Sequence, residues 1–97
     1  MIKHIVTFRF SGSETERRTV ASKFREALLA LPAQIPQLID IEVGININPA
    51  EEWDLVLTAT AASLEDVAIY SAHPAHKAAV ALISEHKAGR VCVDYEI

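Results

Sequence analysis

The sequence has few of the residues that cross-link a fold or build nucleotide and acyl-transfer sites. A single cysteine, Cys92, excludes an internal disulfide and is typical of a reducing compartment. The three glycines form no glycine-rich loop of the kind that cradles phosphate groups. No serine or cysteine stands in a nucleophile motif. The sequence therefore supports neither nucleotide chemistry nor an acyl-enzyme route.

Positive charge and long apolar runs are also scarce. The chain has nine Lys and Arg against 13 Asp and Glu, which gives a formal net charge of −4. Among the basic residues only Arg17 and Arg18 are adjacent in the sequence. Nucleic-acid binding needs clustered basic residues, so we expect no nucleic-acid partner. No segment is long and apolar enough to span a bilayer, and Lys3, His4 and Arg9 interrupt any leader-like run. We therefore expect no membrane partner and a cytoplasmic location.

Hydrophobic residues, in contrast, make up 51% of the 97 positions. This share is well above that of disordered chains and predicts a folded protein. The length predicts a single domain over residues 1–97. A domain of this size buries a modest core and gains much from an oligomer interface.

Four segments alternate apolar and polar residues as half-buried β-strands do. They are residues 2–10, 38–47, 53–61 and 91–97. We expect the apolar side of each strand to meet the helices. The opposite face is expected to carry a mixed set of side chains: Ile5, Asp40, Glu42, Asn46, Val56, Thr58, Thr60, Asp94 and Glu96. Alternation leaves open whether this second face is solvated or forms a wet subunit interface.

Helix signals separate these strands. Residues 13–16 have the form of a capping box, which predicts a helix from there to about residue 31. Ser63 predicts the start of a short second helix that ends near residue 71 or 72. Pro74 fits the first turn of a third helix, expected over residues 75–87 and ended by Gly89.

The resulting order is βαββαβ, with the second helical region broken at residues 73–74. Two right-handed crossovers of this kind produce a four-stranded antiparallel sheet with the helices on one face. The predicted fold is the ferredoxin-like α+β sandwich.

The segment from Tyr70 to His76 concentrates ionisable side chains at the helix break. It places a phenol and two imidazoles, Tyr70, His73 and His76, within seven residues. An imidazole exchanges protons near neutrality, so a tyrosine beside it is a plausible general acid–base partner. A His-Pro dipeptide at a helix start also serves as structural punctuation, and the spacing leaves both interpretations open.

Three further residues are candidate ligand contacts. His4, on the apolar face of the first strand, is either a hydrogen-bonded core residue or a cavity group. His73, beside Pro74, fits a backbone hydrogen bond at the helix break, with a ligand contact as the alternative. Trp53, at a strand start, fits a core or interface position, with a ligand platform as the alternative.

The remaining candidates have simpler interpretations. His86 fits the exposed last turn of its helix, where a cation favours the helix dipole. The alternating neighbours of Cys92 indicate a buried or half-buried inert thiol. His4, His73 and His76 lack the local spacing of a metal site, so we expect no metal.

Several short motifs occur in order along the chain and are fairly specific as a set. They are Ile2-Lys3-His4-Ile5-Val6, Gly44-x-Asn46, Ser63-x-Glu65-Asp66, Tyr70-x-x-His73-Pro74-x-His76 and Val91-x-Val93-Asp94-Tyr95. With this set the chain resembles the stress-responsive dimeric α/β-barrel (Dabb) family over essentially its whole length. The resemblance implies the ferredoxin-like fold and a homodimer that closes a β-barrel through its two sheets. It also implies a cavity between sheet and helices in each subunit.

The resemblance implies two kinds of function. Many members of the family are known only as stress-associated proteins, which implies a stress-responsive homodimer that binds a small molecule in the cavity. One plant branch consists of polyketide cyclases that act without a cofactor, and by position their catalytic pair is Tyr70 and His76. His4 would line the same cavity, with His73 and Trp53 as further candidate contacts. The alternative hypothesis is therefore a cofactor-independent cyclase or lyase acting on an enolisable carbonyl compound.

Overall fold

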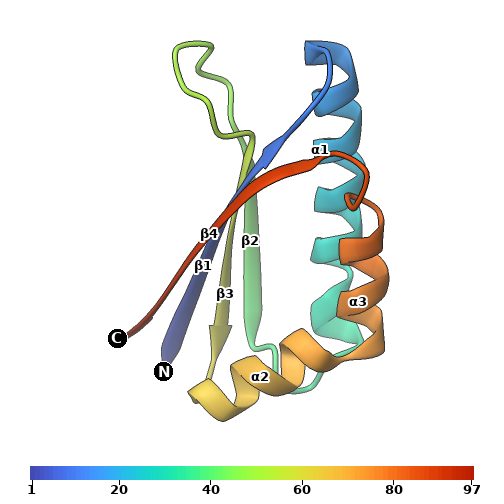
Figure 1. Cartoon of the computed structure of the whole chain (residues 1–97). Helices are drawn as coiled ribbons and strands as arrows, with labels where there is room; N and C mark the ends of the chain where they lie inside the picture. Colours follow the sequence, from blue (N-terminus) through green and yellow to red (C-terminus); the bar gives the residue numbers. More distant parts are fainter.

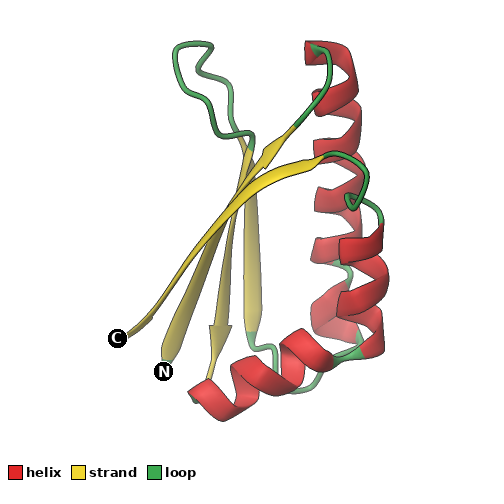
Figure 2. Cartoon of the chain, viewed as in Figure 1, coloured by secondary structure: helices red, strands yellow, loops and turns green.

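The computed structural model describes all 97 residues as an antiparallel sheet with helices against one face (Figures 1 and 2). The four strands stand in the order β2-β3-β1-β4. The elements along the chain are β1 (Ile2–Phe10), α1 (Glu14–Leu29), a short 3-10 helix (Leu31–Ala33), β2 (Asp40–Ile45), β3 (Leu55–Ala61), α2 (Leu64–Ala72), α3 (Pro74–Ala81) and β4 (Lys87–Glu96). The predicted ferredoxin-like sandwich is confirmed.

β1 lies in the interior of the sheet, because it pairs antiparallel with both β3 and β4. The predicted alternation along β1 is confirmed. Its buried side chains are Ile2, His4, Val6, Phe8 and Phe10. These five residues face the helices, so His4 lies inside the sandwich.

α1 packs its apolar stripe against this face. Ser13 Oγ accepts a hydrogen bond from the Glu16 N–H at 3.1 Å, and the Glu16 carboxylate accepts the Ser13 N–H, which completes the predicted capping box. Phe24 and Leu28 are fully buried, and Phe24 lies edge-on to Phe8 with ring centres 5.2 Å apart. These contacts hold α1 over the sheet.

None of the helices combines the length and the apolar composition that a membrane span requires.

The second helical region is broken where the sequence predicts, between α2 and α3. His73 has the extended angles φ −64° and ψ 138°, and its Nδ1 accepts a hydrogen bond from the Ala75 N–H at 3.0 Å. Pro74 fills the first helical turn, where a missing N–H costs nothing. The break redirects the chain, so that Tyr70 and His76 lie against each other with ring centres 4.6 Å apart.

The predicted end of the third helix is wrong. α3 ends at Ala81, β4 already begins at Lys87, and Gly89 lies inside this strand. Helix-favouring residues continue beyond Ala81, but pairing with the neighbouring strand overrides that preference. The His86 carbonyl accepts a hydrogen bond from the Ser11 N–H at 2.7 Å, which fixes the start of β4 beside the end of β1.

The side chains of β4 are distributed over the two sheet faces differently from the prediction. Directly paired residues of antiparallel strands point to the same face, and Asp94 pairs with the buried His4. Asp94 and Glu96 therefore face the helix side, which an edge strand tolerates because its edge is open to water. The outer side of β4 is instead apolar and about half exposed: Val91, Val93 and Tyr95.

β2 and β3 are both shorter than predicted. Ile47 lies beyond the end of β2 and is 90% exposed. β3 begins at Leu55, so Trp53 precedes the strand. The alternation predicted that Trp53 continues the buried face of this strand, and that prediction is wrong. The Trp53 ring packs beside Gly89 and Arg9, with the Arg9 guanidinium 5.6 Å from the ring centre. Trp53 therefore lies on the outer side of the sheet.

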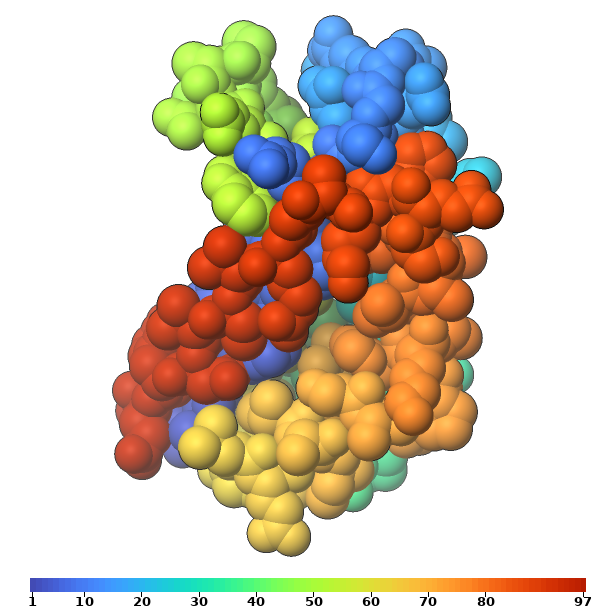
Figure 3. Space-filling view, in the orientation of Figure 1, coloured from blue at the N-terminus to red at the C-terminus, as the bar shows by residue number.

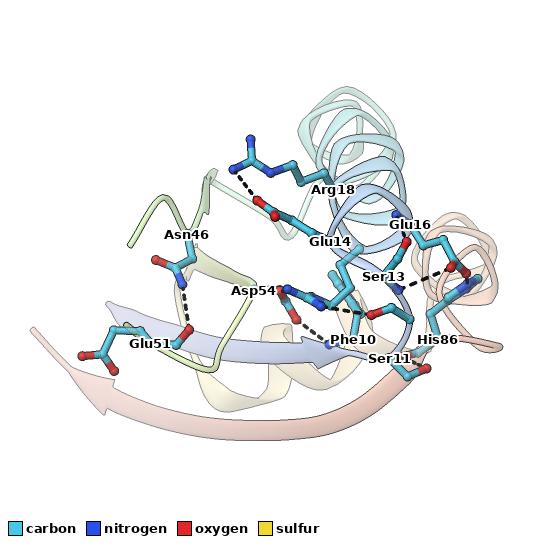
Figure 4. Close-up of polar contacts among 12 residues, drawn as sticks. Phe10, Ser11, Ser13, Glu14, Glu16, Arg18, Asn46, Glu51, Asp54 and His86 are labelled. Carbon is cyan, nitrogen blue, oxygen red and sulfur yellow. Dashed lines mark hydrogen bonds and ion pairs between the residues drawn. The ribbon is translucent and has the colours of Figure 1, made fainter. Parts of the chain in front are cut away.

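Polar contacts at one end of the sandwich tie the loop before β3 to β1 and α1 (Figure 4). Asp54 accepts a hydrogen bond from the Phe10 N–H at 2.7 Å and from Arg17 Nε at 3.3 Å, and this inward turn interrupts the alternation next to Trp53. His86 lies in the loop after α3, half-buried, with Nε2 3.8 Å from the Glu16 carboxylate (Figure 4). Its predicted position in an exposed helix turn is wrong.

Candidate functional site

A small chamber of about 120 Å³ lies between the sheet and the helices. Its apolar lining comes from Val6, Phe8, Phe24, Leu57 and Val80. Its polar lining comes from His4, Ser71, His76, Lys87 and Arg90. Figure 3 shows the surface hollowed between β4 and the α2–α3 segment.

His76 enters the chamber from the first turn of α3. Its Nδ1 lies 2.9 Å from the Ser71 carbonyl oxygen. A carbonyl only accepts hydrogen bonds, so Nδ1 carries the proton and Nε2 of the neutral ring keeps its lone pair. Burial lowers the pKa of His76, and the nearby charges of His4 and Arg90 act in the same direction, against the effect of the Ser71 contact. The ring is therefore neutral at pH 7 and has one basic nitrogen.

Tyr70 is 1% exposed, and its hydroxyl has no hydrogen-bond partner in the protein. The ring lies edge-on to both chamber imidazoles, with centres 4.6 Å from His76 and 6.0 Å from His4. Burial raises the pKa of Tyr70 to about 12, although the charge of Arg90 acts the other way. The phenol is therefore a neutral hydrogen-bond donor. Leaving a buried hydroxyl unpaired costs about 1–3 kcal/mol.

His4 is held by a carboxylate from the neighbouring strand. Its Nδ1 lies 2.5 Å from Asp94 Oδ1, and Cys92 Sγ lies 3.5 Å from the same nitrogen. An ionised carboxylate only accepts hydrogen bonds, so His4 donates through Nδ1, and the contact fixes the orientation of the ring. Asp94 is not among the predicted site residues, because the alternation of β4 predicts it on the outer face. Pairing of the first strand with the last is the signal that identifies it.

Two basic side chains of β4, Lys87 and Arg90, complete the polar lining. Both residues are exposed, and Arg90 pairs across the sheet with Phe8. Arg90 is close enough to Tyr70 and His76 to affect both of their pKa values. Neither residue is among the predicted site residues, and the predicted third helix extends over Lys87.

The structure brings three of the five predicted site residues together. His4 and His76 line the chamber, and the buried Tyr70 ring packs edge-on against both imidazoles. His73 directs its Nδ1 to the backbone of its own helix and serves as the N-cap of α3. Trp53 lies apart from the chamber, on the outer side of the sheet.

A larger cleft of about 460 Å³ lies between α1 and the loop after β2, but it has a different chemistry. Four of its charged groups form two ion pairs with one another (Figure 4). Arg18 Nη2 lies 3.2 Å from the Glu14 carboxylate, and Arg17 donates to Asp54. No histidine, tyrosine or cysteine lines this cleft. We therefore place the candidate site in the chamber.

The lowered pKa of His76 predicts a pH dependence of stability. Below its ordinary value of 6.5 the unfolded state takes up this proton more readily than the folded state does. The contribution of neutral His76 to the free energy of unfolding is therefore fully present above pH 6.5. It is lost as the pH falls through the lowered pKa of His76 in the folded state. Urea unfolding between about pH 5 and 8 should show this loss in the wild type and a weaker dependence in His76→Gln. An identical pH profile in the two proteins would contradict the assignment, and His86→Gln is the matched control.

The fold and the chamber together define the class of protein: a ferredoxin-like α+β domain with a histidine-lined chamber between its layers, next to a buried tyrosine. The family model of the Stress responsive A/B Barrel Domain (Dabb) matches residues 2–97. The chain belongs to this family, as its motifs predict.

Solved structures with the same fold include dimers. A dimeric protein of unknown function from Bacteroides fragilis is 43% identical, with a TM-score of 0.96 over 99% of this chain and 95% of that one. A dimeric ferredoxin-like protein of unknown function from Thermobifida fusca is 30% identical, with a TM-score of 0.78 over 99% and 90%. A hydroxynitrile lyase from Passiflora edulis, 16% identical with a TM-score of 0.72 over 99% and 92%, shares the fold. No curated protein matches the chain.

Proposed function

We propose that this protein is a homodimer, joined through the outer faces of its sheets, that binds a small anionic carbonyl compound in the chamber of each subunit. The observation that carries the proposal is the buried Tyr70 hydroxyl, which has no partner in the protein and belongs to a ring that contacts both chamber imidazoles. A ligand that accepts its hydrogen bond removes the cost of leaving it unpaired. The stress-response role and the cytoplasmic location belong to the same proposal.

The outer face of the sheet supports the dimer. Val93 of β4 pairs with Ile5 of β1, and Thr7 pairs with Val91 on one side and Val56 on the other. These side chains form an apolar stripe across three strands, with Val93 57% exposed and Val56 39% exposed. Such a stripe on a small domain is typical of an interface, and two relatives of at least 30% identity are dimeric.

The charge and size of the chamber support a small anionic ligand. Arg90 and Lys87 supply positive charge, and Arg90 can bind a carboxylate through two hydrogen bonds. The volume of about 120 Å³ is well below the roughly 300–1,000 Å³ of pockets that hold drug-sized ligands. The ligand is therefore expected to be a compound of a few non-hydrogen atoms, much smaller than a polyketide.

The tautomer of His76 favours a second candidate function, cofactor-independent proton transfer. Its free Nε2 would remove a proton next to the carbonyl of the ligand, and the Tyr70 hydroxyl would donate to the enolate oxygen. The two pKa shifts suit these roles, because a neutral imidazole can accept a proton and a neutral phenol can donate a hydrogen bond. This candidate keeps Tyr70 and His76 as the acid–base pair of a lyase- or cyclase-type enzyme.

Tyr70→Phe tests whether the Tyr70 hydroxyl binds the ligand, apart from its effect on the stability of the fold. We expect pyruvate and acetoacetate to raise the melting temperature of the wild type and neutral acetone to have a smaller effect. Tyr70→Phe removes an unpaired hydroxyl, so it should be as stable as the wild type or more stable by about 1 kcal/mol, yet lose the response to the carboxylates. The closing-strand residue Tyr95, on the outer face, gives the matched control Tyr95→Phe. A stable wild type that responds to neither carboxylate, or a Tyr70→Phe protein that responds fully, would contradict the proposal.

A further inference from the structure

A second cluster of reactive side chains lies at the pairing of β1 with β4. Cys92 and Asp94 are two residues apart on β4 and therefore project to the same face, where His4 of β1 lies directly opposite Asp94. Cys92 Sγ lies 3.5 Å from His4 Nδ1 and 3.9 Å from Asp94 Oδ2. One donor atom from each residue lies within 4.8 Å of the other two.

We propose that His4, Cys92 and Asp94 form a binding site for a divalent metal ion of the zinc type. The site offers one nitrogen, one sulfur and one oxygen ligand, a mixed set that suits a borderline-soft ion such as Zn²⁺ or Co²⁺ better than Mg²⁺ or Ca²⁺. Three protein ligands leave a fourth tetrahedral position open. The site does not rest on the proposed carbonyl-binding function.

The distances in the cluster fit such an ion after one small movement. Ligand bonds of about 2.0–2.3 Å to a tetrahedral zinc ion place neighbouring ligand atoms roughly 3.3–3.7 Å apart. The sulfur–nitrogen distance of 3.5 Å already lies in this range. The 2.5 Å contact of His4 with Asp94 must widen by about 1 Å, and the Asp94 side chain, 32% exposed, has room to rotate.

Metal binding also has a consistent proton balance. The Cys92 thiol releases its proton and binds as a thiolate. The proton on His4 Nδ1 moves to Nε2 of the same ring, so that Nδ1 can bind the ion, while Asp94 stays ionised.

Cobalt(II) titration of the metal-free wild type tests the site, because Co²⁺ bound to a thiolate absorbs in the near ultraviolet and four-coordinate Co²⁺ absorbs in the visible. We expect both bands to reach their full intensity at one ion per chain and to disappear on addition of Zn²⁺. Cys92→Ser should lose the near-ultraviolet band, and Asp94→Asn should weaken binding at least tenfold. Glu96→Gln, which changes the next carboxylate on the same side of β4, should bind as the wild type does.

Thiol protection gives a second readout that needs no variant. Zn²⁺ should slow the alkylation of Cys92 by iodoacetamide at least tenfold, and Mg²⁺ should leave the rate unchanged. The proposal is overturned if Co²⁺ gives no thiolate band in the wild type, if the band persists in a folded Cys92→Ser protein, or if Zn²⁺ leaves the alkylation rate unchanged.

Discussion

Val93→Asp should convert the proposed dimer into a folded monomer. Val93 is 57% exposed on the outer face of the sheet and pairs with Ile5 in the middle of the apolar stripe. A two-fold interface would bury two copies of the new carboxylate within the apolar stripe, which is costly. We expect a loss of about 4 kcal/mol or more in association free energy, which is about a thousandfold increase in the dimer dissociation constant.

Sedimentation equilibrium over a range of concentrations measures this change. Leu82→Asp is the matched control, since Leu82 is 53% exposed but follows α3 on the helix side of the molecule. That variant should remain as dimeric as the wild type. A wild type with the mass of one chain at all concentrations, or a dimeric Val93→Asp protein, would show that the outer face is not the interface.

His76→Gln should lower the rate of proton exchange on a bound carbonyl compound at least a hundredfold. General-base catalysis by a positioned side chain contributes about 10²–10⁴-fold, and glutamine keeps the size of the side chain without a basic nitrogen. The measurement is the loss of the methylene proton signal of acetoacetate in deuterated water, followed by nuclear magnetic resonance. The background exchange without protein is subtracted in every case.

His86→Gln controls for a general effect of removing a histidine, because His86 lies in the loop after α3, away from the chamber. The methylene protons of acetoacetate should exchange at the wild-type rate in the presence of this variant. Equal rates in the wild type and His76→Gln would reject proton transfer by His76 and leave ligand binding as the proposed function. The two candidate functions are therefore tested separately.

The parts of the fold and site that the sequence predicts are those that depend on local spacing. The capping box at Ser13 and the break at Pro74 each lie within a few residues, and both occur in the structure as predicted. The contact of Tyr70 with His76 follows from the same break, which joins two helices at a sharp turn. Local chemistry is enough to identify these features because no distant element has to decide them.

The parts that the sequence does not predict depend on pairing between distant strands. Asp94 reaches His4 only because β4 pairs with β1, and alternation alone placed it on the other face. Trp53 leaves the buried face because Asp54 turns inward to cap the Phe10 N–H. In each case a tertiary hydrogen bond outweighs a local pattern that is otherwise well formed.

The pairing of β4 with β1 determines which side chains lie on each face of the sheet. With the carboxylates of β4 on the helix side, the outer face becomes more apolar than the sequence suggested, and the interior gains an acidic partner for His4. The same register brings Cys92 next to that histidine. One pairing therefore underlies the proposed dimer interface, the orientation of the chamber imidazole and the proposed metal site.

The four histidines provide the most direct test that the chamber is the binding site. Their ring nitrogens can be followed in one long-range proton–nitrogen correlation spectrum, with pyruvate or acetoacetate added in turn. We predict that one or both compounds shift the signals of His4 and His76 and leave those of His73 and His86 in place. Absence of any shift with both compounds, or equal shifts in all four rings, would contradict this assignment.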